Sequence, residues 1–341
     1  MNNKIQKLED PLHEKVLPLF ANKLKINHHS ATQWSKCDGA WIYEYLLLTQ
    51  EQRRTLLKGN AQMKAGVAVN NVLQNYYSDF IWKFGPQGKL TPTKNELKKD
   101  KQVLIHEQLE EFKNYEPHDE KDQQKKEKYL DEISNVIANG FTAMDKLIKL
   151  GFAVVSEEQI SVDQAFSGLL LPIVGRTDFR FHSADSFPAS HGDLSASGIV
   201  ELKTIWSKAG KIKKDGERGF INAKLPTKPS LNHLVQCAMY SSHYNYQIPI
   251  YLVYLTKDGY LIFDSSNCAE LTQEGLQKNF KILCNTFRRR EKILGQFEDQ
   301  DKDTIIKSAI SLVDPNFDHP FAWNNLPDDL LKHAKELWNY E

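Results

Sequence analysis

Two short stretches near the middle of the chain alternate hydrophobic and polar residues with a period of two. In residues 174–181, Asp178 and an arginine alternate with two phenylalanines, and in residues 198–204, Glu201 and Lys203 alternate with apolar residues. Because successive side chains of a strand point to opposite faces, both stretches predict short strands. Glu201 and Lys203 are therefore expected to project from one face of a sheet, while their apolar neighbours enter a core.

Apolar residues at helical spacing and further apolar runs predict the remaining elements. We expect helices over residues 61–84, 129–150 and 328–338, a helix around Gln236 that begins near Ser230, and strands over residues 152–162, 249–256 and 260–264. An order of helix, three strands, helix and strand predicts an α/β fold. The expected architecture is a mixed central β-sheet flanked by helices, with helical additions at the N- and C-terminal ends.

Asp178 and Glu201 place one carboxylate on each central strand, beside the ammonium group of Lys203. Carboxylates are hard oxygen ligands that suit Mg²⁺ or Mn²⁺, and the backbone carbonyl of Leu202 is placed to be a third ligand. A cation bound there lowers the pKa of an attacking water and neutralises charge on a phosphate. Lys203 would orient that water and stabilise the transition state. The pattern therefore predicts metal-assisted cleavage of a phosphodiester.

This arrangement resembles the D…(D/E)xK signature of the PD-(D/E)XK nuclease superfamily, specifically its RecB-like exonuclease branch. That branch carries a Gln-x-x-x-Tyr helix after the lysine strand, which Gln236 and Tyr240 match. Residues at i and i+4 share a helix face, so both can address one phosphate or base. The resemblance covers about residues 30–265 and implies a restriction-endonuclease-like core. The catalytic residues that it implies are Asp178, Glu201, Lys203, Gln236 and Tyr240.

The resemblance also implies further metal ligands, which this sequence supplies in part. Where the family has a histidine in a Gly-x-x-x-His helix, this chain has Asn70, whose amide oxygen is a weaker ligand, and a plain core helix explains it equally well. Of two adjacent acidic residues, Glu158 is favoured over Glu157 because it shares a strand face with apolar positions. Some members use a cysteine like Cys37 to hold an iron–sulfur cluster. The other clustered cysteines are missing, so Mg²⁺ or Mn²⁺ and no iron–sulfur cluster are expected.

Residues 206–230 are predicted to form a basic loop beside the lysine strand. Seven lysines and arginines stand there against Asp215 and Glu217. Such a loop suits contacts with a DNA backbone, and an aromatic ring suits stacking on a base. A solvated loop without a partner is the alternative interpretation. The expected DNA-binding residues are Trp206, Lys208, Lys211, Lys213, Lys214, Arg218 and Lys224.

The chain of 341 residues is 40% hydrophobic and carries 44 basic and 44 acidic residues. This balance argues against a protein that coats DNA, but not against an enzyme with a local basic groove. No apolar run approaches a membrane span, and the scattered cysteines suit a reducing compartment. We therefore expect a cytoplasmic protein, in the host cytoplasm if a phage encodes it. The expected divisions are an N-terminal arm (1–29), a nuclease domain (30–290) with a charged helical insertion (85–128), and a C-terminal tail (291–341).

The predicted function is a metal-dependent exonuclease that hydrolyses phosphodiesters from DNA ends in phage-type replication or recombination. Its expected partners are linear DNA and phage recombination or replication proteins. The sequence carries no P-loop, so we expect a nuclease without a helicase motor. Two alternatives stay open: a structure-selective or sequence-specific endonuclease on the same fold, and a catalytically inactive DNA-binding module. The intact Asp178, Glu201 and Lys203 argue against the inactive module, whereas Asn70 in the histidine position favours it.

Overall fold

A seven-stranded mixed β-sheet forms the centre of the computed structural model, in the order β12-β11-β8-β7-β4-β2-β3. Its strands are β2 (Phe80–Phe84), β3 (Leu90–Lys94), β4 (Phe152–Ser156), β7 (Phe179–Ser183), β8 (Gly198–Thr204), β11 (Ile250–Thr256) and β12 (Gly259–Phe263). The β8–β11 and β2–β4 pairs are parallel and the other pairs antiparallel. The expected mixed α/β architecture is confirmed. The structure describes residues 17–49, 51–53, 59–84, 90–148, 152–183, 197–212, 218–319, 322–323 and 326–340.

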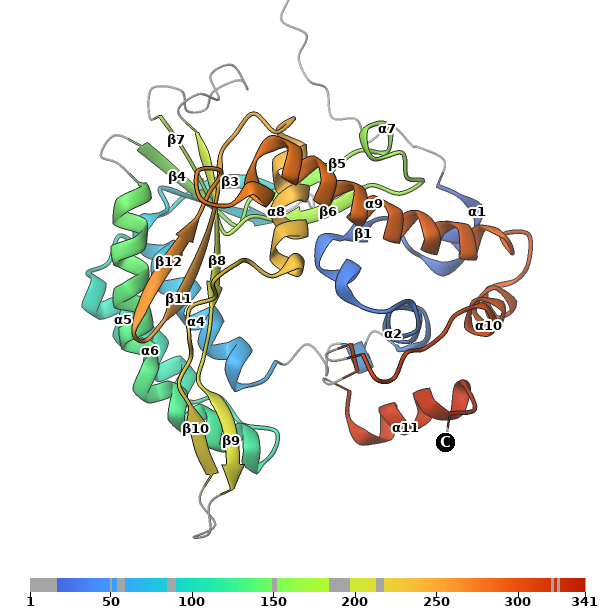
Figure 1. Ribbon diagram of the computed structural model, residues 1–341, viewed down its shortest axis with the longest axis horizontal. Helices are drawn as coiled ribbons and strands as arrows, with labels where there is room; N and C mark the ends of the chain where they lie inside the picture. The colour runs from blue at the N-terminus through green and yellow to red at the C-terminus, as the bar shows by residue number, and fades with distance from the viewer. Residues whose placement is uncertain are drawn as a thin grey trace, which may run out of the picture.

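Helices cover both faces of this sheet (Figure 1). One face packs against α4 (Ala61–Tyr77), α5 (Lys101–Lys113) and α6 (Glu120–Leu147), and the other against α8 (Leu231–His243) and α9 (Gln273–Gly295). Val200 and Leu202 of β8 enter the core on the α4 side, whereas Ile199 enters the core on the α8 side. Because strand side chains alternate, Glu201 and Lys203 face α8, as the sequence pattern predicted.

Two stretches that were each expected to form one strand are instead divided between the central sheet and a smaller second sheet. The predicted strand 152–162 breaks at Glu157, whose φ of 56° is left-handed, into β4 and β5 (Gln159–Val162). Residues 174–181 likewise divide into β6 (Ile173–Arg176) and β7, with Asp178 between them. β5 and β6 join β1 (His29–Ser30) in a small three-stranded sheet. The site residues therefore lie where the chain crosses from one sheet to the other.

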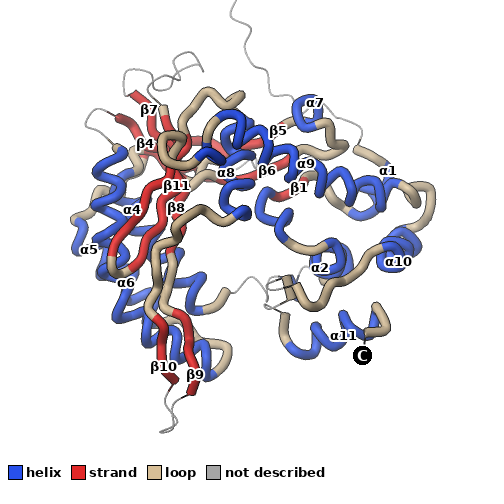
Figure 2. Tube along the Cα trace, in the orientation of Figure 1, coloured by secondary structure: helices blue, strands red, loops and turns tan. Residues whose placement is uncertain are grey.

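Three other predicted segments differ from the structure. Helix α4 ends at Tyr77, because residues 80–84 of the predicted helix form strand β2, which pairs with β3 along the sheet edge. The expected helical insertion at 85–128 thus includes a strand, β3, together with α5 and the start of α6. The expected loop after β8 contains an antiparallel hairpin, β9 (Lys208–Ile212) and β10 (Arg218–Ile221), which extends away from the sheet (Figure 2).

The two ends of the described chain pack together into a helical lobe beside the sheet (Figure 1). Its elements are α1 (Leu19–Leu24), α2 (Asp38–Ile42), the π-helical turn η2 (Tyr43–Leu47), α10 (Lys302–Leu312) and α11 (Asp328–Leu337). The 3-10 turn η1 (Ala31–Ser35) between β1 and α2 instead packs with the core on the α8 side of the sheet. Residues 17–29 of the expected arm form the short helix α1 and strand β1, while residues 1–16 lie outside the described residues. The expected domain boundary at residue 290 falls inside α9, whose last turns belong to the lobe core.

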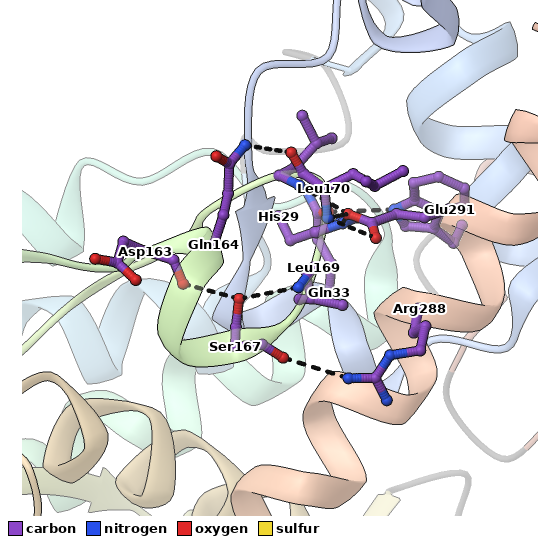
Figure 3. Close-up of polar contacts among 11 residues, drawn as sticks. His29, Gln33, Asp163, Gln164, Ser167, Leu169, Leu170, Arg288 and Glu291 are labelled. Atoms are coloured by element: carbon purple, nitrogen blue, oxygen red, sulfur yellow. Dashed lines mark hydrogen bonds and ion pairs between the residues drawn. The ribbon is translucent and has the colours of Figure 1, made fainter. Parts of the chain in front are cut away.

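A buried polar joint connects this lobe to the small sheet (Figure 3). The Glu291 carboxylate on α9 accepts the backbone N–H groups of Leu170 and Leu171 at 2.9–3.0 Å and bonds His29 Nε2 at 2.9 Å. Leu170 and Leu171 follow the short helix α7 (Gln164–Ser167). One residue earlier, the 1% exposed Arg290 pairs with Asp38 of α2. Within the described part of the chain, no helix is both long enough and apolar enough to cross a membrane.

Candidate active site

Asp178 lies at the point where β7 separates from β8. The β7–β8 ladder ends at the Phe179–Val200 pair, and beyond it Asp178 Oδ2 accepts the Leu202 N–H at 2.7 Å. The Asp178 carboxylate thus replaces the backbone carbonyl that would accept this N–H group if the β7–β8 ladder continued. The N–H and C=O of one strand residue point to the same side, so the Leu202 carbonyl also faces Asp178.

Glu201 and Lys203 form an ion pair at the α8 face of β8. Glu201 is only 1% exposed. Burial and the nearby charge of Asp178 raise the pKa of Glu201 to about 8. Burial alone would lower the pKa of Lys203, but the charges of Glu201 and Asp178 raise it above its usual value. The two carboxylates of Asp178 and Glu201 carry more negative charge than Lys203 alone neutralises. Without a bound cation, the pocket therefore favours a further proton or a further positive charge.

Gln236 and Tyr240 on α8 hold Lys203 in place through a chain of hydrogen bonds. Lys203 Nζ donates to Gln236 Oε1 at 3.1 Å, and Gln236 Nε2 donates to Tyr240 Oη at 2.5 Å. Tyr240 Oη in turn donates to the Arg176 carbonyl at 2.6 Å. Tyr240 is 1% exposed and its hydroxyl is bound within the protein, although the residue forms part of a cavity wall. Both residues orient the lysine.

Helix α4 brings Asn70 against Asp178. A side chain at Gly66, one turn earlier, would have its Cβ 3.0 Å from Thr204 Oγ1, so the missing side chain lets the helix approach β8 closely. Asn70 Nδ2 donates to Asp178 Oδ1 at 3.1 Å. This contact turns the amide oxygen of Asn70 away from the carboxylate. The structure thus joins Asn70 to the Asp178 site, as the sequence interpretation expected.

Two buried oxygen atoms beside Asp178 lack a hydrogen-bond donor among the described residues. They are Asn70 Oδ1 and Glu201 Oε2. A buried acceptor without a partner costs about 1–3 kcal/mol, and more when it is charged. Oxygen atoms of this kind are what Mg²⁺ or Mn²⁺ takes as ligands, so the residues fit such a cation. The candidate ligands are Asp178, Glu201 and the Leu202 carbonyl, together with Asn70 once its amide rotates to turn the oxygen toward Asp178.

The donor set contains only two carboxylates. Among the residues described, no three histidine, cysteine, aspartate or glutamate side chains gather in a way that could hold a metal ion. A site at Asp178 therefore depends on neutral oxygens from Asn70 and Leu202 to complete it. Mg²⁺ tolerates such a set, because it keeps several water ligands and needs only one or two carboxylates.

Glu158 does not join this donor set, contrary to the sequence interpretation. Its carboxylate pairs with Arg180 Nε at 2.5 Å and accepts from Tyr244 Oη at 3.1 Å, on the α8 side of β7. The left-handed turn at Glu157 sends the two adjacent acidic side chains in different directions. Glu157 accepts from Gln74 at 2.8 Å, and Gln74 lies one turn after Asn70 on α4. The acidic residue nearer the Asn70 face is therefore Glu157.

Trp206 is also unavailable for the predicted contact with DNA. The side chain is 2% exposed, its Nε1 donates to Thr204 Oγ1 at 3.0 Å, and its ring lies 5.0 Å from that of Tyr129. Trp206 thus anchors the base of the β9–β10 hairpin. Lys208 and Lys211 of β9 and Lys224 after β10 are exposed. Lys213 and Lys214 lie outside the described residues, as does the side chain of Arg218, whose backbone begins β10.

A polar cavity of about 320 Å³ lies on the small-sheet side of Gln236 and Tyr240. The side chains that line it include His28, Ser30 and Arg176.

No match was found for this chain among protein-family models, curated proteins or solved structures.

Sequence reasoning missed one polar pair beside Lys203. His233, three residues before Gln236 on α8, bonds Tyr254 of β11 at 2.7 Å. The i, i+3 spacing to Gln236 was the available signal, since such residues share a helix face.

Proposed function

We propose that this protein is a metal-dependent DNA exonuclease of the RecB-like branch of the PD-(D/E)XK superfamily. The observation that supports this most is the pair of buried oxygens, Glu201 Oε2 and Asn70 Oδ1, that lack donors beside Asp178. Without a cation, burial and the charge of Asp178 raise the pKa of Glu201 to about 8, so the carboxyl keeps a proton in place of a ligand, and Asn70 Oδ1 has no donor among the described residues. A divalent cation can take the place of that proton, and nuclease chemistry uses such a cation.

The residues of the chain would divide the catalytic work among them. A bound Mg²⁺ or Mn²⁺ would supply an activated water and neutralise charge on the phosphate. Asp178 and Glu201 would hold that cation, and the Leu202 N–H fixes the Asp178 carboxylate at 2.7 Å. The Lys203 ammonium group, oriented by Gln236 at 3.1 Å, would stabilise the negative charge that grows on the phosphate oxygens.

The polar cavity next to Gln236 and Tyr240 favours cleavage at a DNA end. Its volume of about 320 Å³ lies at the small end of the range for small-ligand sites, and it suits one nucleotide and not a duplex. Hydroxyl, imidazole and guanidinium groups in its lining suit a sugar–phosphate. We therefore place the terminal nucleotide of a DNA strand in this cavity, with the adjacent phosphodiester at Asp178 and Glu201.

The test uses linear DNA labelled at either end and a covalently closed circle of the same sequence. In Mg²⁺ we expect progressive loss of the linear DNA and survival of the circle, and no cleavage in EDTA. Glu201→Gln, checked for folding by circular dichroism, should remove the activity. Equal cleavage of circles and linear DNA would replace this proposal with the endonuclease. Absence of cleavage with retained DNA binding would favour the inactive module.

A further inference from the structure

His233 and Gln236 form two neighbouring links between α8 and the central sheet. Lys203 of β8 and Tyr254 of β11 are register partners in the parallel pair, so their side chains leave the same sheet face side by side. Gln236 bonds Lys203 at 3.1 Å, and His233 bonds Tyr254 at 2.7 Å. His233 therefore lies beside the ammonium group of Lys203, displaced by about 4.5 Å along the helix axis from Gln236.

The contacts of Tyr254 favour one of the two tautomers of His233. Tyr254 Oη accepts the backbone N–H of Ser230 at 3.3 Å, and the hydroxyl proton is then available for His233 Nδ1 at 2.7 Å. An imidazole whose Nδ1 accepts carries its proton on Nε2. Burial, followed by the charge of Lys203, lowers the pKa of His233 to about 3, which agrees with a neutral ring.

The Nε2–H group of His233 is free to bind a ligand. Of the residues that the structure describes, none forms a hydrogen bond with it, and the side chain is partly exposed. A purely structural role for His233 needs only Nδ1, whose bond to Tyr254 already joins α8 to β11. The second nitrogen instead presents a neutral donor to solvent beside Lys203.

We propose that His233 Nε2–H donates to a non-bridging oxygen of a substrate phosphate next to the one that is cleaved. This inference rests on the proposed function, because it takes the phosphate at Lys203 as the reacting one. A DNA strand that places one phosphate at Lys203 carries the next phosphate one nucleotide away, and His233 is the neighbouring donor on the same helix face. A neutral donor binds a phosphate oxygen without adding positive charge beside Lys203. His233 thus acts in substrate binding and register, not in the chemical step.

The test separates the donor from the structural nitrogen. His233→Asn keeps a short side chain with an acceptor near the Nδ1 position and removes the distal donor, whereas His233→Gln places an amide N–H near the Nε2 position. Equilibrium binding is measured in Ca²⁺ with an end-labelled oligonucleotide carrying either natural phosphates or one methylphosphonate, which lacks the charged oxygen. His243→Asn, in the last turn of the same helix, is the control.

We expect His233→Asn to weaken binding of the natural oligonucleotide about tenfold, as expected for a lost hydrogen bond to a charged group. The difference between wild type and variant should vanish when a methylphosphonate occupies one particular position near the end. His233→Gln should recover most of the affinity, and His243→Asn should bind as wild type does. No loss, or a loss that is equal for every methylphosphonate position, overturns the inference. Cleavage of natural DNA by the wild type in Mg²⁺ tests the proposed function separately.

Discussion

Two buried glutamates, Glu201 and Glu291, have opposite surroundings. Glu291 is 3% exposed, and both of its oxygens accept hydrogen bonds, from two backbone N–H groups and from His29. Glu201 is 1% exposed, but only one oxygen has a partner, Lys203, and the other has none among the described residues. A fully bonded buried charge is explained by the fold that it joins together. A partly bonded one either keeps a proton, as the raised pKa of Glu201 indicates, or binds a cation at the open oxygen.

The same substitution at both positions gives the largest test of this comparison. Glu201→Gln should reduce cleavage of end-labelled DNA in Mg²⁺ by about a thousandfold or more, since a lost metal ligand removes several kcal/mol of transition-state stabilisation. Its melting temperature in EDTA should match that of the wild type below the ordinary carboxyl pKa of 4.5 and exceed it at higher pH, because the unfolded wild type then loses the Glu201 proton that the fold keeps up to about pH 8. Near wild-type cleavage by a folded Glu201→Gln protein would refute the site.

Glu291→Gln should show the reverse pattern. The amide places an N–H group against the backbone donors of Leu170 and Leu171, and a buried polar group left without its partner costs about 1–3 kcal/mol. We expect a clear loss in the free energy of unfolding from urea denaturation, with cleavage per folded molecule unchanged. A variant that is as stable as the wild type would show that the joint contributes little to the fold.

The stability of the wild type relative to Glu201→Gln is also expected to depend on pH. In the metal-free protein the pKa of Glu201 is raised from 4.5 to about 8. Between these values the unfolded chain loses a proton that the folded chain keeps, so stability falls as pH rises. The slope is at most about 1.4 kcal/mol per pH unit.

This pH dependence can be measured by thermal melting in EDTA from pH 5 to pH 8. The wild type should lose stability relative to Glu201→Gln across this range, and the difference should shrink when Mn²⁺ is present, because the cation favours the ionised carboxylate. The histidines titrate in both proteins, so the comparison with the variant cancels their contribution. Parallel melting curves at every pH would mean that Glu201 is already ionised without metal.

The sequence predicted the site better than the path of the chain around it. Alternation around Glu201 and Lys203 fixed which face each side chain takes, because a strand has only two faces. It did not reveal the left-handed turn at Glu157, or that Glu158 pairs with Arg180 and Tyr244 and not with the Asp178 site. Pattern alone does not distinguish a ring that enters a core from one that meets DNA. Trp206 therefore received a contact with DNA that its burial rules out.

Long-range pairing explains the remaining differences. Residues 80–84 continue the apolar pattern of α4, but pairing with β3 and β4 makes them a strand. Arg290 belongs to a run of three arginines that looks like a phosphate-binding patch, yet it is 1% exposed and pairs with Asp38, which is 252 residues away. Its neighbours in space, and not in sequence, determine its role.

The smallest expected effect concerns the exposed β9–β10 hairpin. Lys208 and Lys211 are exposed on β9, which begins four residues after the end of β8, and the buried ring of Trp206 fixes the hairpin base. If these lysines contact phosphates, Lys208→Gln with Lys211→Gln should lower the dependence of log Kd on log salt by about two. Binding would weaken only modestly at physiological salt. The measurement is fluorescence anisotropy of labelled DNA over a salt series in Ca²⁺.

A matched control makes that small effect interpretable. Lys302→Gln with Lys307→Gln removes the same charge from exposed positions of α10, in the helical lobe. A general loss of positive charge changes both double variants alike, because it acts over the whole surface. A phosphate contact changes the salt slope of the hairpin variant alone. An equal slope in both variants and the wild type would return the hairpin to a solvated element, and DNA contacts would then be confined to the Asp178 site and its cavity.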